Sequence, residues 1–292
     1  MRGDGTMAAR EQGGGEPRPR RRRSLRERRR VEPISPHLSL VRAPRRNGTE
    51  RPLDGEIRVA TYNVHRWTGL NGRSRPDPAR AAFVISEIDA DLVALQEVLR
   101  PPRGPDPLVS LADALGLHVA FATTRAHREG HIGNAILSRW PIASVSMLDL
   151  SYGRLEKRVA VVVQLVHGGF ELDVVATHLA LADRTRVRQV RSLLEHPRLR
   201  ETPTLLMGDM NAWRNCKATR ALDRELSLGD GIEWPPSFPS ASPVLALDRI
   251  YARGMDIVSI GAHASRAARR ASDHLPVVAR VRLPVPTSPA PH

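Results

Sequence analysis

Short apolar runs alternate with helical patterns from residue 57 onward, and this alternation restricts the possible folds more than any other feature of the chain. The runs are short and often rich in β-branched side chains, which is typical of strands. Eleven strands are too many for one small sheet. Several of them are apolar on both faces, so each of these strands must be covered by other elements on both sides. The sequence therefore predicts an α/β fold with two packed sheets and helices outside them. The expected strands are Ile57–Tyr62, Asp91–Gln96, Val119–Thr123, Ile132–Leu137, Ile142–Leu148, Arg158–Val166, Leu172–Thr177, Thr204–Met207, Leu247–Ala252, Ile257–Ala262 and Leu275–Val281.

Four segments between these runs have helical periodicity. Asp77 and Asp183 are suitable N-caps for two of them, and Pro78 is acceptable in a first helical turn. The expected helices are Pro78–Asp89, Pro107–Leu115, Asp183–Glu195 and Cys216–Glu225.

Residues 1–54 contain runs of arginine, abundant Gly and Pro, and almost no aromatic or β-branched side chains. Such a segment buries too little apolar surface to offset the entropy of ordering, so we expect a disordered tail. It is either a basic arm that contacts nucleic acid or an anionic membrane surface, or a solvated tail, with Met7 as an alternative start. The expected folded domain is residues 55–284, followed by a second disordered tail over residues 285–292.

The net charge of +14 suggests an acidic partner such as nucleic acid or anionic lipid, but two observations reduce its weight. Only Lys157 and Lys217 are lysine among 45 basic residues, so the arginine content indicates a general compositional bias. The first 54 residues carry 15 Arg against 7 acidic residues, a net +8, which leaves +6 for the rest. The expected domain is therefore only mildly basic.

The single cysteine, Cys216, excludes an intrachain disulfide and a cysteine-rich metal site, and it favours a cytoplasmic location. No apolar segment suits a secretory signal or a membrane span, so we expect a soluble protein without a transmembrane segment. The sequence indicates no oligomeric state.

Polar side chains recur where the apolar runs end or begin. Because ligands of open α/β sheets bind at the carboxyl ends of strands, and strands of opposite direction bring their starts to the same edge, we expect one cluster. Its members are Asn63, Glu97, His178, Asp209 and Asn211 at run ends, and Asp248, Asp273 and His274 at run starts.

Two motifs in this cluster, GDMNAW from Gly208 and SDH from Ser272, combine carboxylates with an amide and a histidine. Metal-assisted attack of water on phosphate requires groups of these kinds: one to activate the water, one to orient, and a base or electrophile. The sequence therefore points to phosphate chemistry before any family is considered.

The ordered motifs TYNVH, ALQEV, GNAILSR, VATHL, GDMNAW, LDRIY and SDHLP together resemble the endonuclease/exonuclease/phosphatase superfamily over residues 57 to about 283. That superfamily includes pancreatic-type deoxyribonucleases, AP endonucleases, neutral sphingomyelinases and inositol polyphosphate phosphatases. The resemblance implies a four-layer, DNase I-like sandwich of two mixed sheets between helices.

The resemblance implies that Glu97 binds Mg²⁺ or Mn²⁺, with Asn63 beside the ion and Asp273 completing its coordination directly or through water. Asp209 is expected to position or deprotonate the attacking water, and Asn211 to donate to the developing charge on phosphate.

A second group of residues is expected to act on the phosphate. His274 contacts it as an imidazolium or transfers a proton, and Asp248 holds its other ring nitrogen and raises its pKa. His178 is a general acid or phosphate ligand; AP endonucleases have an amide here, so abasic-site repair is disfavoured. Arg158 grips a phosphate oxygen or lies at a sheet edge, and Asn134 lines the groove or makes a turn.

Other residues near the motifs are expected to be structural. His65, by strand alternation, need not face the metal. The four tryptophans do not interleave with a basic stripe, so they are expected to be packing residues and loop anchors.

These features predict a metal-dependent phosphohydrolase acting on a phosphodiester or phosphate ester, with a nuclease as the first choice. The alternative is a phospholipid or sugar-phosphate phosphodiesterase or phosphatase, because Pro235–Ala252 resembles bacterial superfamily members of undefined substrate. A third alternative is a binding module without catalysis. None of the loops expected to line the groove contains a long basic insertion of the kind that would bind a nucleic-acid duplex.

Overall fold

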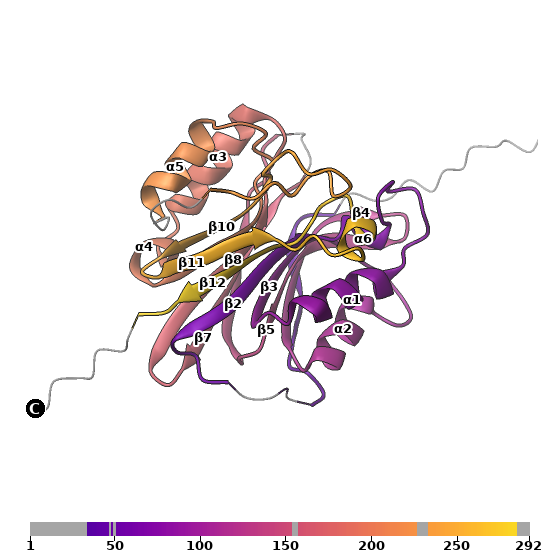
Figure 1. Ribbon diagram of the computed structural model, residues 1–292, viewed down its shortest axis with the longest axis horizontal. Helices are drawn as coiled ribbons and strands as arrows, with labels where there is room; N and C mark the ends of the chain where they lie inside the picture. The colour runs from indigo at the N-terminus through magenta and orange to yellow at the C-terminus, as the bar shows by residue number, and fades with distance from the viewer. Residues whose placement is uncertain (1–33, 47, 49–50, 154–156, 227–232, 285–292) are drawn as a thin grey trace, which may run out of the picture. The chain divides into compact units, whose positions relative to one another are not determined.

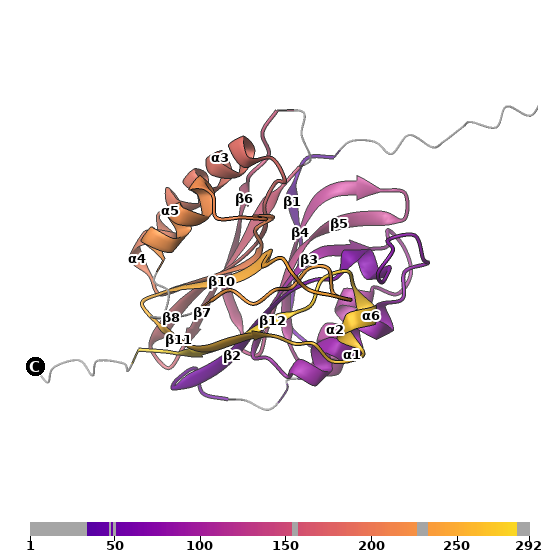
Figure 2. The ribbon, with the colours of Figure 1, turned by 45° about the horizontal axis from the view of Figure 1, so that its top comes forward.

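The computed structural model describes residues 34–46, 48, 51–153, 157–226 and 233–284. Across these residues a pair of sheets packs face to face and helices cover their outer faces, as Figures 1 and 2 show from two directions. The predicted α/β architecture of two mixed sheets flanked by helices, a DNase I-like fold, is confirmed.

The larger sheet has seven strands in the order β1-β4-β5-β3-β2-β12-β11. Only β2 and β3 are parallel neighbours in it, and the other neighbours are antiparallel. Its strands are β1 (His37–Arg42), β2 (Glu56–Asn63), β3 (Leu92–Arg100), β4 (His118–His127), β5 (Gly130–Ser138), β11 (Asp256–Ala262) and β12 (Val277–Arg282).

The smaller sheet has five strands in the order β10-β9-β8-β7-β6, with β8 and β9 parallel. Its strands are β6 (Ile142–Asp149), β7 (Val159–His167), β8 (Phe170–His178), β9 (Thr204–Asp209) and β10 (Asp248–Arg253). The helices of the described chain are η1 (His65–Trp67), α1 (Pro78–Ile88), α2 (Pro107–Leu115), α3 (Asp183–Leu194), α4 (Arg198–Glu201), α5 (Lys217–Glu225) and α6 (Ala268–Ala271).

Three layers of buried apolar side chains hold these elements together. The middle layer fills the space between the sheets, with Val59 from β2 and Val161 from β7 among its members. A second layer joins the larger sheet to α1, α2 and α6, and a third joins the smaller sheet to α3, α4 and α5. Central strands such as β8 are buried on both faces, which is why they read as continuous apolar runs.

All eleven expected strands and all four expected helices are present, with ends that differ by a few residues. Asp183 is wrong as an N-cap, because Ala182 occupies that position and Asp183 is the first helical residue. Asp77 is the N-cap residue of α1 but makes no capping hydrogen bond. Asp106, which was not predicted, caps α2 by accepting from the N–H groups of Leu108 and Val109.

The start of the folded region at residue 55 is corrected, because β1 lies within the segment expected to be disordered. Arg42 on this strand pairs with Asp113 at 3.0 Å, and Arg51 pairs with Asp91 at 3.0 Å. Leu53 is 3% exposed and belongs to the middle layer. The alternating sequence from His37 to Arg42 is a strand pattern that the arginine-rich composition of its surroundings obscured. Residues 1–33 and 285–292 lie outside the described residues.

In the described ranges, none of the helices combines the length and apolar character needed to cross a membrane.

Gly208 allows the two strands that carry the site to lie side by side. It has φ of +155° and pairs with Thr177 across the parallel β8 and β9 strands. A Cβ atom at this position would lie 2.0 Å from the carbonyl oxygen of Thr177, which is backbone and cannot rotate away. Glycine is therefore required here by sheet geometry, one residue before Asp209.

We expect Gly208→Ala to lower the free energy of unfolding by about 3 kcal/mol or more, because the added methyl group forces β8 and β9 apart. Urea denaturation measures this. The matched control is Gly261→Ala on β11, where no atom lies within 4 Å of the added Cβ and the expected change is within about 0.5 kcal/mol. Equal stability of the two variants would contradict the close approach described above.

Candidate active site

Asp209 lies where both sheets contribute side chains to one buried cluster. It is the last residue of β9, and the strand register places it beside His178 on β8 and Asp248 on β10. Because β8 and β9 are parallel and β10 is antiparallel to them, two strand ends and one strand start meet at one edge. The structure thus brings these three predicted residues together.

Three nitrogen atoms converge on one oxygen of Asp209. Oδ2 accepts a hydrogen bond from Asn63 Nδ2 at 3.1 Å, and it lies 3.3 Å from His178 Nε2 and 3.8 Å from His274 Nε2. Asn63 ends β2 and His274 precedes β12, so these two come from the larger sheet. The other oxygen, Oδ1, accepts from the backbone N–H of Asn211 at 2.9 Å. One carboxylate therefore connects the two sheets.

Burial makes the carboxyl group of Asp209 a stronger base than an exposed aspartate. The residue is 1% exposed, and burial raises its pKa to about 6, although the positive charge of His274 opposes this. Asp248 raises the pKa further, whereas the hydrogen bonds from Asn211 and Asn63 lower it. At neutral pH the group is largely ionised and its pKa lies close to the pH of the solution, which suits a general base.

His274 lies between two carboxylates. Its Nδ1 is 2.8 Å from Asp248 Oδ2, which also accepts a hydrogen bond from Ser237 Oγ at 2.6 Å. Phe238 packs on the imidazole with ring centroids 4.9 Å apart. Burial alone lowers the pKa of His274, but the charges of Asp248 and Asp209 and the hydrogen bond to Asp248 outweigh it and raise the pKa to about 10. His274 is therefore an imidazolium at neutral pH.

His178 has the opposite electrostatics. It is 5% exposed, and burial lowers its pKa well below the usual value, with further lowering by the charges of Arg158, His274 and Arg125. A neutral imidazole can still donate one hydrogen bond, and Nε2 of His178 lies 3.3 Å from Asp209 Oδ2. At neutral pH this disfavours the general-acid alternative for His178 and favours a donor to Asp209 or to phosphate.

Glu97 lies at a β-bulge inside β3, which corrects the expectation that it follows the strand's end. The pairing with β5 shifts between Leu95 and Val98, and Glu97 has φ of 53°. A bulge of this kind redirects one side chain out of the regular alternation. Glu97 Oε2 lies 3.5 Å from Arg66 Nε, and its side chain is 22% exposed.

Asp273 contacts His65, for which the sequence predicted a structural role away from the metal. His65 Nδ1 lies 3.1 Å from Asp273 Oδ1, and its backbone N–H donates to Asn63 Oδ1 at 3.0 Å. Strand alternation does not apply, because β2 ends at Asn63 and His65, Arg66 and Trp67 have φ of 45°, 57° and 64°. Burial raises the pKa of Asp273, but the hydrogen bond from His65 and nearby positive charges lower it overall.

Two groups of side chains have donor atoms suited to a metal ion. We call Asn63, Glu97 and Asp273 the outer group, because the two carboxylate side chains are 22% and 26% exposed. The inner group is Asp209, Asp248 and His274, whose ligand atoms lie within 4.8 Å of one another and whose side chains are nearly inaccessible.

The outer group fits a hard divalent cation better than the inner group does. Mg²⁺ prefers oxygen ligands and is commonly held by one or two carboxylates. In the inner group, the imidazolium of His274 already balances the carboxylates, and a metal bound there would have to displace a proton with a pKa of about 10. In the outer group, the side chains beside the carboxylates are those of His65 and Arg66, which are partly exposed and can be replaced by a metal ion.

A small hollow beside His178 carries the predicted phosphate ligands. Arg158, which directly precedes β7, is 6% exposed, and Asn134 on β5 donates through Nδ2 to the Val159 carbonyl of the facing sheet at 2.9 Å. The hollow has a volume of about 10 Å³, the space of roughly one water molecule. Its lining is completed by Glu97, Thr124, Arg125, Ile132 and His178. Arginine and amide groups here can bind an anionic oxygen.

Asn211 is fixed by a buried guanidinium that sequence reasoning missed. Its Nδ2 donates to the Leu179 carbonyl at 2.8 Å, so one of its two amide N–H bonds is used. Arg186 on α3 is 3% exposed and donates through one nitrogen to the carbonyls of Ala180, Leu181 and Asn211. This side chain joins the loop after β8 to the loop after β9.

Sequence reasoning also missed Ser237, Arg66 and Arg125. Ser237 lies in a proline-rich loop with no fixed spacing to Asp248, so no sequence pattern indicated their contact. Arg66 follows Asn63 by three residues, and its left-handed conformation could not be read from its residue type. Arg125 belongs to β4, whose expected end at Thr123 excluded it.

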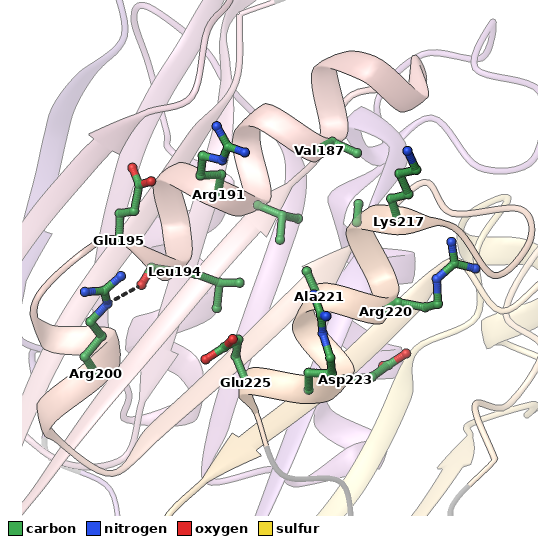
Figure 3. Close-up of a pocket in the computed structure, with 13 residues that line it drawn as sticks. Val187, Arg191, Leu194, Glu195, Arg200, Lys217, Arg220, Ala221, Asp223 and Glu225 are labelled. Atoms are coloured by element: carbon green, nitrogen blue, oxygen red, sulfur yellow. Dashed lines mark hydrogen bonds between the residues drawn. The ribbon is translucent and has the colours of Figure 1, made fainter.

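A separate groove of about 760 Å³ runs between α3 and α5, and Figure 3 shows its lining. Aliphatic side chains such as Val187, Leu194 and Ala221 alternate there with charged ones such as Arg191 and Glu195. No residue of the outer or inner metal group lines it. Size alone does not identify the reactive site in this fold.

We expect Asp248→Asn to lower the pKa of His274 from about 10, because it removes the negative charge that favours the imidazolium while keeping a hydrogen-bond acceptor. NMR titration of the metal-free protein measures this. His274 has a higher pKa folded than unfolded, so its stabilisation is complete below about pH 6.5 and is lost toward pH 10. An unchanged His274 titration in this variant would contradict the assignment.

Comparisons with known proteins agree with this geometry. A family described as "Endonuclease/Exonuclease/phosphatase family" matches residues 60–274. The uncharacterised protein YbhP of Escherichia coli is 32% identical over 247 residues, which cover 78% of this chain and 96% of YbhP.

Two solved structures of lower identity share the fold. A mannosyl-6-phosphatase of Bacteroides thetaiotaomicron is 20% identical, with a TM-score of 0.60 over 77% of this chain and 99% of its own. The TDP2 protein of D. rerio, complexed with a single-strand DNA product, is 16% identical, with a TM-score of 0.56 over 78% of this chain and 100% of its own. The sequence matches over most of the chain show that it belongs to the endonuclease/exonuclease/phosphatase family.

Proposed function

We propose that this protein is a divalent-metal-dependent phosphohydrolase in which water attacks phosphorus in line and a P–O bond breaks. The observation that carries the proposal is the convergence of Asn63, His178 and His274 on one oxygen of the buried Asp209 carboxylate. A base of raised pKa beside a fixed imidazolium supplies the two opposite charges that attack on phosphate needs.

In the proposed reaction, Asp209 orients the attacking water and accepts its proton. Its pKa of about 6 leaves it ionised at neutral pH, and burial makes protonation more favourable than for an exposed carboxylate. His178, kept neutral by burial, lies 3.3 Å from an oxygen of the same carboxylate and keeps that oxygen in position.

His274 supplies the fixed positive charge that lies opposite the phosphate oxygens. A pKa of about 10 makes its imidazolium a weak proton donor at neutral pH, so we favour electrostatic contact over proton transfer for this residue. Asn211 has one amide N–H left to donate to the same developing charge. Arg158 and Asn134 hold another oxygen of the phosphate in the hollow beside His178.

The outer group of Asn63, Glu97 and Asp273 would hold the metal ion, for which Mg²⁺ or Mn²⁺ is the expected identity. When bound, such an ion neutralises charge on the phosphate oxygens and polarises the bond to be broken. The lowered pKa of Asp273 keeps its carboxylate ionised and available for this at neutral pH.

The substrate class is not fixed by the fold, because the same fold supports different substrates. The expectation of a nuclease stays a prediction, as do the phospholipid or sugar-phosphate alternative and the binding module without catalysis. A panel of circular and linear DNA, RNA, sphingomyelin, inositol phosphates and the soluble diester bis(p-nitrophenyl) phosphate, with Mg²⁺ or EDTA, separates them.

We expect Asp209→Asn to lower kcat/KM by about a thousandfold on every substrate that the wild type cleaves, because it removes the base but keeps the shape. Initial rates measure this. The matched control is Asp256→Asn at an exposed position of β11, which should keep the wild-type rate. If wild type and Asp209→Asn are equally inactive throughout, the binding module gains support; if both are equally active, Asp209 is not the base.

We expect Glu97→Gln to raise the Mg²⁺ concentration for half-maximal rate at least about tenfold, because an amide binds a hard cation more weakly than a carboxylate does. Metal titration of the initial rate measures the change, and calorimetric titration of Mn²⁺ measures binding without turnover. Asp248→Asn serves as the inner-group control and should leave the metal requirement near the wild-type value. A larger shift for Asp248→Asn than for Glu97→Gln would move the metal to the inner group.

A further inference from the structure

The three most exposed large apolar side chains among the described residues lie on loops beside the candidate active site. Val244 is 70% exposed, Leu181 is 64% and Trp213 is 61%. Leu70, 41% exposed, lies on a fourth loop of the same kind. We call these four residues the apolar rim.

Leu181 and Trp213 belong to loops that Arg186 connects. Leu181 follows β8 by three residues, and Trp213 follows β9 by four. Arg186 donates to the carbonyl of Leu181 and to that of Asn211, two residues before Trp213. Arg214 and Asp183, the neighbours of these loops, lie 3.7 Å apart. The two apolar side chains therefore come from adjacent loops at the edge where His178 and Asp209 end their strands.

Val244 and Leu70 are joined to the other side of the site. The Val244 N–H donates to the carbonyl of Phe238, whose ring packs on His274. The residue before Leu70, Gly69, forms a bridge with Ser272, next to Asp273. Three of the loops thus leave or enter strands at the edge that carries Asp209 and Asp248, and the fourth, which joins η1 to α1, contacts the segment before β12 through the bridge of Gly69 with Ser272.

This grouping differs from the scattered exposure of apolar residues elsewhere. The other exposed large apolar side chains, Leu38, Val41, Phe83, Val166 and Val258, lie on β1, α1, β7 and β11. Single exposed apolar residues are normal on soluble proteins, whereas several around one opening mark a binding surface. A substrate must be able to reach the candidate site that these four residues surround. A molecule that contacts the apolar rim would therefore bring the phosphate into the site with it.

Charge identifies the kind of surface that fits. The four loops together with the first residues of α3 and α5, residues 68–77, 179–185, 211–217 and 233–247, contain five basic residues against three acidic ones. The basic members are Arg73, Arg75, Arg184, Arg214 and Lys217, and all five are exposed. A partner must therefore present apolar groups and negative charge together. Of the four residues of the apolar rim, only Trp213 offers nucleic-acid bases an aromatic ring to stack on, whereas the aliphatic side chains of Leu70, Leu181 and Val244 suit acyl chains.

We propose that the apolar rim docks this protein onto an anionic phospholipid membrane, so that a lipid headgroup phosphate enters the site. The docking stands on the rim alone, and hydrolysis of the headgroup rests on the proposed function. Trp213, Leu181 and Val244 contact the interface, and the five cations face anionic headgroups. The scissile ester is then cleaved by water, which gives one oxygen to phosphorus while the leaving oxygen takes a proton.

The test of docking uses full-length protein in EDTA and vesicles of equal parts phosphatidylcholine and phosphatidylglycerol, with pure phosphatidylcholine for comparison. Wild type should float with the anionic vesicles, and its tryptophan emission should shift to shorter wavelength. Trp213→Phe should bind as well but lose most of that shift. The variant L181S/V244S/W213S should bind at least about tenfold more weakly, because it removes the apolar contact.

The matched control is V41S/V166S/V258S, which changes three exposed valines on β1, β7 and β11 and should bind as wild type does. Both triple variants keep the arginine-rich start of the chain, so a difference between them isolates the apolar rim. Equal binding of the two variants, or an unshifted Trp213, would overturn the proposal. Stronger binding of a single-stranded oligonucleotide than of vesicles, with the same emission shift, would assign the rim to nucleic acid instead.

Two further measurements separate this inference from the proposed function. L181S/V244S/W213S should cleave bis(p-nitrophenyl) phosphate at the wild-type rate but release headgroup from vesicles at least about tenfold more slowly. Asp209→Asn should bind vesicles normally and cleave neither. A wild type that cleaves the soluble diester without binding vesicles refutes only the docking. A wild type that binds vesicles but cleaves no phosphoester refutes the proposed hydrolysis and leaves the docking.

Discussion

The buried carboxylate of Asp209 is the interaction on which the site depends. An isolated charge at 1% exposure would cost several kcal/mol, and the surrounding nitrogen atoms offset that cost. Asn63 and His274 belong to one sheet and its flanking segments, and His178 and Asn211 belong to the other. The nitrogen atoms therefore surround the Asp209 carboxylate only when the two sheets are packed together. The geometry of the candidate site is thus a result of how the two sheets pack together.

Each titratable group in the site has a different set of charged neighbours, so chemically similar residues have different pKa values. Two histidines lie near the same oxygen, yet His274 is held as an imidazolium by Asp248 while His178 is kept neutral by burial and nearby positive charges. The carboxylates differ in the same way, with the pKa raised for Asp209 and lowered for Asp273. Environment therefore gives residues of one type opposite shifts in pKa.

The fold could be predicted because the periodicity of apolar residues indicates which faces of each strand and helix are buried. The buried faces in turn determine how the sheets and helices stack in layers. Strand ends also placed Asn63, His178 and Asp209 at one edge, since register follows from parallel pairing. What could not be predicted depends on departures from periodicity: the bulge that redirects Glu97, the left-handed turn that brings His65 to Asp273, and the loop contact of Ser237. Composition misled at β1, where local alternation was outweighed by neighbouring arginines.

The span of sequence that the site draws on has a consequence for how activity first arises. Asn63 and His274 are 211 residues apart, and Ser272 Oγ donates to the carbonyl of Asn63 at 2.7 Å, which joins the second strand of the fold to the segment before the last. A chain that ends before Asp273, whether still being synthesised or clipped there, lacks both the carboxylate of Asp273 and the imidazole of His274. The candidate site is therefore complete only when the segment just before the final strand has been added to the rest of the sandwich.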